Sequence, residues 1–136
     1  MFGKHLTHDA VIADTTGMSV TPSQFELLGR LLDAASLRHQ VIAQNVANVN
    51  TPGYHRLDVS FEETLSRELQ EDGEAIGERE GPRVIEATGG VVREDGNNVD
   101  IDVEMGRLNK NTLIYNVYAQ ILATKIAAMR SAITGR

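Results

Sequence analysis

Cysteine and tryptophan are both absent from this chain of 136 residues. Without cysteine the chain has no disulfide, no thiolate metal ligand and no thiol nucleophile. Aromatic residues make up only 4 % of the sequence, so apolar packing must come mostly from Leu, Ile, Val, Ala and Met, which suit contacts between helices. No segment is long and apolar enough to span a membrane, and none near the N-terminus resembles a cleavable signal peptide. We therefore expect no direct membrane insertion.

The net charge of −6 is concentrated in the middle of the chain. Residues 62–86 hold nine acidic and three basic side chains, which leaves the remainder close to neutral. A basic surface of the kind that binds nucleic acid is therefore not expected. The length fits one domain, which we place at residues 21–136. Residues 1–20 show no apolar period and are expected to form a flexible N-terminal tail.

Apolar residues spaced alternately by three and four positions predict a long helix over residues 21–49. Thr21 and Gln24 can form a capping box, and Pro22 suits the first helical position. The pattern stops before Pro52-Gly53, which favours a turn. The apolar seam of this helix consists of Leu28, Leu32, Ala35, His39, Ile42 and Val46.

The same alternation predicts a second long helix over residues 100–133. Its seam consists of Met105, Leu108, Thr112, Tyr115, Ala119, Leu122, Ile126 and Met129. The negative charges of Asp100, Asp102 and Glu104 would interact favourably with the positive, N-terminal end of the helix dipole. An antiparallel pairing of the two helices would place His39 and Thr112 in one buried polar layer, where each could satisfy the other.

The middle segment, residues 50–99, shows weaker patterns. Ser60-Phe61-Glu62-Glu63 resembles a capping box and predicts a short helix. The pairs Val84-Ile85 and Val91-Val92 flank Gly89-Gly90, which predicts a small hairpin. The fold class is therefore mainly α. Long N- and C-terminal helices pair as an antiparallel coiled coil around a small irregular or β-hairpin-containing middle segment.

The two terminal helices each have an apolar face too wide for a single helix–helix contact. No third long helix is predicted that could cover the remainder, so an ordinary intramolecular bundle is the less favoured alternative. Exposed apolar surface of this size is typical of an interaction site. The two seams are therefore predicted to mediate assembly with other chains.

Residues 45–54 read NVANVNTPGY, in which a helix end rich in asparagine is followed by a Pro-Gly turn and an aromatic residue. The amides of Asn45 and Asn48 lie on one helix face and could bond backbone carbonyls or another chain, although capping explains either one alone. Residues 38–61 resemble the N-terminal signature of the flagellar axial proteins. The residues of this motif are Asn45, Ala47, Asn48, Asn50, Thr51, Pro52, Gly53 and Tyr54.

Two further segments, residues 95–115 and 129–133, resemble the C-terminal helix of the FlgB family of proximal rod proteins. The resemblance implies a structural subunit of the bacterial flagellar basal-body rod that polymerises through its terminal helices and transmits torque. It also implies contact with itself, other rod proteins and the MS-ring adaptor FliE, and passage through the flagellar type III export apparatus to the periplasmic rod. The alternatives are the sister rod family FlgC or another coiled-coil interaction protein.

Sites for chemistry are poorly supported by the sequence. His5 and His8 form an HxxH pair but lack a third ligand, so we expect no metal site. The stretch from Asp95 to Asp100 places its glycine at the wrong position for a calcium loop. No spacing indicates a Ser/His/Asp arrangement or a phosphate loop. We therefore predict no cofactor, no catalytic residue and no enzymatic activity.

Overall fold

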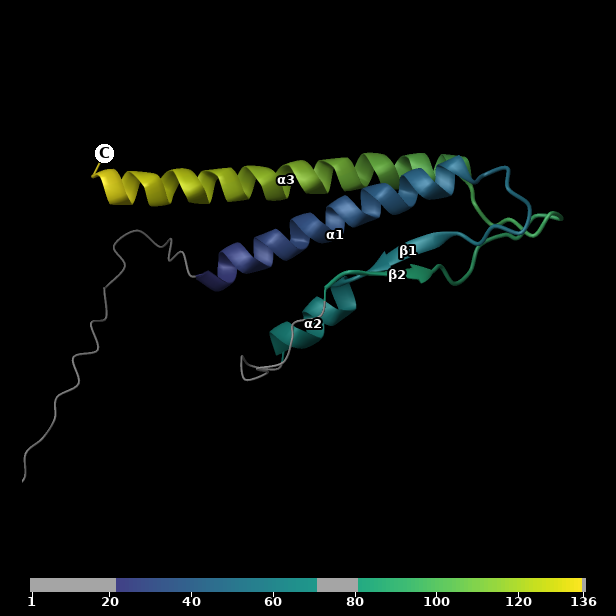
Figure 1. Cartoon of the computed structure of the whole chain (residues 1–136), viewed down its shortest axis with the longest axis horizontal. Helices are drawn as coiled ribbons and strands as arrows, with labels where there is room; N and C mark the ends of the chain where they lie inside the picture. The colour runs from purple at the N-terminus through teal and green to yellow at the C-terminus, as the bar shows by residue number, and fades with distance from the viewer. Residues whose placement is uncertain (1–21, 71–80, 136) are drawn as a thin grey trace, which may run out of the picture.

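A computed structural model of the chain describes residues 22–70 and 81–135, and two long helices dominate it (Figure 1). Helix α1 spans Pro22–Ala47 and helix α3 spans Ile101–Thr134. Lys125 bonds Gln24 and Asn45 bonds Glu104, so the helices run antiparallel. The predicted fold class is confirmed. The predicted tail over residues 1–20 lies outside the described residues, as does Thr21 of the first capping box.

Helix α1 supplies most of the apolar core. Its buried apolar residues are Leu28, Ala34, Ala35, Val41 and Ile42. Helix α3 begins where the carboxylate of Asp100 accepts hydrogen bonds from the backbone N–H groups of Asp102 and Val103, as an N-cap does. It ends at Gly135, which adopts a left-handed conformation with φ of 67°. Within the described ranges, no helix is long and apolar enough to cross a membrane.

The structure confirms a two-stranded hairpin in the middle segment with Val84-Ile85 in one strand, but the other strand is not the predicted one. Strand β1 (Leu57–Ser60) pairs antiparallel with strand β2 (Arg83–Glu86), with Leu57 opposite Glu86. The expected turn at Gly89-Gly90 is therefore wrong, and Val91-Val92 is exposed and forms no strand. Strand β1 lies against α1 and buries Val59. Because this packing holds β1 in place, β1 is a better partner for Val84-Ile85 than Val91-Val92 is.

The short helix predicted after the second capping box is present as α2 (Glu62–Gln70). Phe61, just before it, is one of the most deeply buried side chains in the described part of the chain. The guanidinium of Arg30 on α1 lies 5.4 Å from the centre of its ring, a distance suited to a cation–π contact. Arg38 also bonds both Val59 and Glu62. These contacts attach the hairpin to α1.

The predicted seam residues divide into buried and exposed groups. On α1, Leu28, Ala35 and Ile42 are buried and Leu32 and Val46 are half-buried. On α3, Leu108, Ala119 and Leu122 are half-buried, whereas Met105, Tyr115, Ile126 and Met129 are 42–47 % exposed. The face of α3 that contacts α1 is thus rotated away from the predicted seam. Whether the exposed members mediate assembly stays a prediction.

The expected polar layer needs a correction. His39 and Thr112 do lie at one level, because both line the same cavity between α1 and α3. Both are exposed, however, and the Thr112 hydroxyl donates to the carbonyl of Leu108 on its own helix. The buried polar residue at this level is Asn111, whose amide donates to the carbonyl of Ala35.

Candidate functional site

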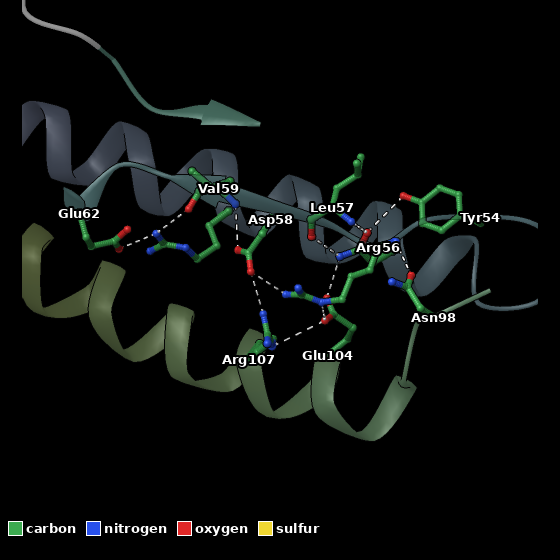
Figure 2. Close-up of polar contacts among 11 residues, drawn as sticks. Tyr54, Arg56, Leu57, Asp58, Val59, Glu62, Asn98, Glu104 and Arg107 are labelled. Carbon is green, nitrogen blue, oxygen red and sulfur yellow. Dashed lines mark hydrogen bonds and ion pairs between the residues drawn. The ribbon is translucent and has the colours of Figure 1, made fainter. Parts of the chain in front are cut away.

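A cluster of polar side chains lies where the C-terminal end of α1 meets the N-terminal end of α3 (Figure 2). We call this cluster the junction. It consists of Asn45, Tyr54, Arg56, Asp58, Glu104 and Arg107. Its members come from α1, from the turn after it, from β1 and the residue just before it, and from α3. Two parts of the chain that are distant in sequence, residues 45–58 and 104–107, therefore share one polar network.

Asn45 is completely buried and uses its full hydrogen-bonding capacity. Its amide nitrogen donates to the carbonyl of Leu57 at 2.8 Å and to Glu104 Oε2 at 2.9 Å. Its amide oxygen accepts from the backbone N–H of Leu57 at 2.9 Å and from the Tyr54 hydroxyl at 3.2 Å. A carboxamide is the side chain that offers two donors and two acceptors in this arrangement. Asn45 thus connects α1 to both β1 and α3.

Glu104 is also completely buried, and its negative charge is balanced by arginine. Arg56 Nε donates to Glu104 Oε1 at 2.6 Å, and the other end of that guanidinium bonds Asp58 at 2.9 Å. Arg107 bonds Asp58 at 3.0 Å and lies 3.7 Å from Glu104 Oε1 (Figure 2). Removing one partner of such a buried pair would leave an uncompensated charge, at a cost of about 3–5 kcal/mol.

The buried carboxylate also affects the neighbouring phenol. The pKa of the Tyr54 hydroxyl lies above its ordinary value because burial disfavours the charged phenolate, and because the negative charge of Glu104 opposes ionisation. Tyr54 therefore remains a neutral hydrogen-bond donor to Asn45 throughout the physiological pH range.

A second cluster holds the carbonyl end of α1. We call residues 93–98 the clasp. Asn97 is completely buried, and its amide donates to the carbonyls of Asn48, Val49 and Thr51 at 2.8–3.2 Å. These carbonyls lie just beyond the end of α1 at Ala47, so the amide of Asn97 holds the turn that follows the helix. Arg93 adds a further bond to the Val49 carbonyl.

The clasp also contacts the Pro-Gly turn through the backbone. The N–H of Gly53 donates to the carbonyl of Asp95 at 2.8 Å. Gly53 and Gly96 both have positive φ, and a β-carbon on Gly96 would lie 3.4 Å from the Gly53 α-carbon. Glycine suits both positions because it adopts positive φ without the penalty that a β-carbon brings. Asn98 extends the contact by accepting from the backbone N–H of Arg56 at 2.7 Å.

The axial-protein motif is divided between these contacts and the surface. Asn45 and Tyr54 belong to the junction. Asn48 donates to the carbonyl of Gln44 and accepts from the Thr51 hydroxyl, so it caps the helix locally. The remaining motif residues are exposed, namely Ala47, Asn50, Thr51, Pro52 and Gly53. Their role in contacts between chains stays a prediction.

Sequence reasoning did not assign the buried roles of Glu104 and Asn111, although a signal was available. Glu104, Asn111, Tyr118 and Lys125 recur every seven positions along α3. Three of them form hydrogen bonds with α1. Glu104 bonds Asn45, Asn111 bonds the Ala35 carbonyl, and Lys125 bonds Gln24. This polar heptad marks the face of α3 toward α1. The predicted seam residues that follow each heptad position, such as Met105 and Ile126, lie to one side of this face.

The junction is a network of paired charges and hydrogen bonds that joins α1, β1 and α3. Its carboxylates are paired with guanidinium groups, and no group of three or more potential metal-ligating His, Asp or Glu side chains is found in the part of the chain that the structure describes. A 560 Å³ groove beside it, between α3 and the hairpin, is lined by Arg38, Asp58 and Arg107, whose charges are already paired. The arrangement fixes the relative positions of the helices.

Comparison with known proteins connects this geometry to a family. A family model described as "Flagella basal body rod protein" matches residues 32–55, from within α1 to the residue after Tyr54. The flagellar basal body rod protein FlgB of Borrelia hermsii is 34 % identical over 125 residues, covering 78 % of this chain and 92 % of the relative. FlgB of Bacillus subtilis is 28 % identical, with 87 % and 98 % covered. FlgB of Escherichia coli is 27 % identical, with 72 % and 83 % covered.

Proposed function

The chain belongs to the FlgB family of flagellar basal body rod proteins, and from this premise we propose that it polymerises through the outward faces of α1 and α3 to transmit torque. The chain is a structural rod subunit of the flagellar basal body. The family implies association with itself and with other rod components, and a non-enzymatic role. The alternatives, FlgC or another coiled-coil interaction protein, gain no support from the relatives found.

The observation that carries this proposal is the apolar surface on both sides of α3. The first flank consists of Met105, Thr112, Tyr115, Ala119, Ile126 and Met129. The second flank consists of the exposed apolar residues Val103, Val117 and Ile121. The polar heptad between them bonds α1, and Leu108, Ala119 and Leu122 beside it are half-buried. Exposed apolar residues on both flanks are typical of a subunit with a neighbour on each side.

The finer assignments rest on the family. We propose that residues 21–136 act as one rod domain in the proximal rod, with residues 1–20 as a separate tail. We also propose contact with the MS-ring adaptor FliE and delivery by the flagellar type III export apparatus. Cross-linking in living cells checks the first contact. A covalent product that contains both this chain and FliE supports it, and rods in which FliE never cross-links to this chain contradict it.

The Ile126→Asp variant tests polymerisation through the first flank. Ile126 is 47 % exposed in the single chain, so the carboxylate stays solvated there, but an unpaired charge would be buried in an assembled rod. We expect normal helicity by circular dichroism and no variant in isolated basal bodies. Ala127→Asp, on the neighbouring exposed position facing away from α1, is the matched control. Motile cells with intact rods containing Ile126→Asp would contradict the assignment.

A further inference from the structure

The counter-charge of Glu104 comes from outside the two long helices. Glu104 on α3 is completely buried, and Arg56, the residue just before β1, donates to its Oε1 at 2.6 Å (Figure 2). The backbone of Arg56 is held in turn by the middle segment. Its carbonyl accepts from the N–H of Ala87, which follows β2, at 2.9 Å, and its N–H donates to Asn98 at 2.7 Å. The hairpin and the clasp therefore place this guanidinium.

Strand β1 also satisfies the buried amide of α1. The N–H and carbonyl of Leu57 bond the side chain of Asn45 at 2.9 and 2.8 Å. The other cation near Glu104 is Arg107, whose side chain is 42 % exposed and bonds Asp58 of β1. Its Nε lies 3.7 Å from Glu104 Oε1, too far for a hydrogen bond. If β1 left α1, Asn45 would lose two partners and Glu104 would lose its hydrogen-bonded guanidinium.

The loss of these partners would act on the helix pair as well as on the hairpin. The groups left without partners lie where α1 and α3 face each other, because Asn45 and Glu104 bond one another at 2.9 Å. A charge buried between two helices without its counter-charge is strongly unfavourable, whereas separation of the helices returns that charge to water. An apolar side chain at position 104 would carry no such penalty. The buried carboxylate thus favours pairing of the helices only while Arg56 is in place.

We propose that Arg56 and Glu104 make the pairing of α1 with α3 conditional on docking of the hairpin, so that the hairpin and the helix pair open and close as one unit. Arg56 is then a positioning residue that acts through Glu104. A contact made on the hairpin is transmitted to the helices, because whatever displaces β1 also releases α3 from α1. The coupling is a property of the single chain and does not depend on the proposed polymerisation.

Because the chain contains no cysteine, single introduced thiols can report the two openings separately. Val59→Cys places a thiol on β1 at a position that is 5 % exposed, and reports undocking of the hairpin. Ala35→Cys places one at a position that is 1 % exposed on α1, beside Asn111 of α3, and reports separation of the helices. The rate of reaction of each full-length variant with a bulky thiol reagent measures the opening constant. In the otherwise unaltered chain, we expect the two constants to agree within about threefold.

Substitutions at the ion pair test whether it carries the coupling. Arg56→Met keeps the apolar stem and removes the counter-charge, and should raise both opening constants by about 100-fold or more. Adding Glu104→Gln removes the buried charge and keeps an acceptor for Asn45. In this double variant, we expect the opening constant at Ala35→Cys to fall by about tenfold or more from its value in the single variant, while Val59→Cys stays fast. If Arg56→Met alone fails to fold by circular dichroism, the double variant is compared with the unaltered chain instead.

Arg38→Met is the matched control, because Arg38 bonds the Val59 carbonyl and Glu62 but not Glu104. It weakens the docking of the hairpin and leaves the coupling intact, so both opening constants should rise by the same factor. A hairpin thiol that already reacts about tenfold faster than Ala35→Cys in the unaltered chain or in Arg38→Met overturns the proposal. So does a double variant in which the two reporters still open together, or one that stays unfolded after the buried charge is removed.

Discussion

Asn45 illustrates at the scale of one residue how the polar network holds the chain together. Its four hydrogen bonds reach Tyr54, both backbone groups of Leu57, and Glu104. In Asn45→Ala, these buried groups would lose partners, and we expect the free energy of unfolding to fall by about 3 kcal/mol. Asn50→Ala, at an exposed motif position, should change it by no more than about 0.5 kcal/mol. Urea unfolding followed by circular dichroism compares them. Equal effects would mean that the network contributes little.

Asp95 provides a pH prediction at the same scale. The pKa of its carboxyl lies below the ordinary value, first because Arg93 hydrogen-bonds it and second because the backbone N–H of Asn97 does so. A lowered pKa in the folded chain means that this stabilisation is present above the unfolded pKa and is lost as the pH falls through the folded one. We expect stability to decline below about pH 4, and less steeply in Asp95→Asn. Identical pH profiles of the thermal midpoint would contradict this role.

At the scale of elements, the turn after α1 depends on backbone conformation. Gly53 has φ of 69° and nothing lies within 4 Å of its missing β-carbon, so the cost of substitution there is conformational rather than steric. We expect Gly53→Ala to destabilise the chain by about 1 kcal/mol and Gly53→Val to destabilise it further. Gly29→Ala inside α1 is the matched control, since it also meets no neighbour, and should stabilise the chain by about 0.5–1 kcal/mol. Thermal midpoints that fall in a different order would refute the conformational argument.

The whole molecule is unevenly stabilised along its length. The junction and the clasp hold one end of the helix pair, whereas the bond between Gln24 and Lys125 is the last described hydrogen bond between α1 and α3 at the other end. Beyond it, Ile126, Met129 and Ile133 are exposed. Amide hydrogen exchange of the dilute chain should therefore be fastest over residues 126–134 and slowest near Glu104. Assembly into rods should slow exchange in that terminal segment. Uniform protection along α3 in the dilute chain would contradict this gradient.

The sequence predicted both terminal helices nearly to the residue because their signals are local. Spacing, caps and the Pro-Gly turn act within a few positions and require no knowledge of distant segments. The hairpin was mispredicted because the partner of Val84-Ile85 is β1, which lies over twenty residues earlier and is fixed by its packing on α1. Short apolar pairs such as Val84-Ile85 do not indicate which distant strand they will pair with.

The sequence alone determined the fold class, which has two long helices with apolar faces at the chain ends. It also indicated that these faces are too wide for the two helices to bury each other completely. What only the tertiary structure decided is which face of α3 meets α1. Apolar periodicity marks every surface that avoids water, whether the partner is within the chain or outside it. The face toward α1 is instead marked by polar groups, Glu104, Asn111 and Lys125, whose partners are defined only when the helices are side by side. That pairing leaves Met105, Ile126 and Met129 of α3 exposed.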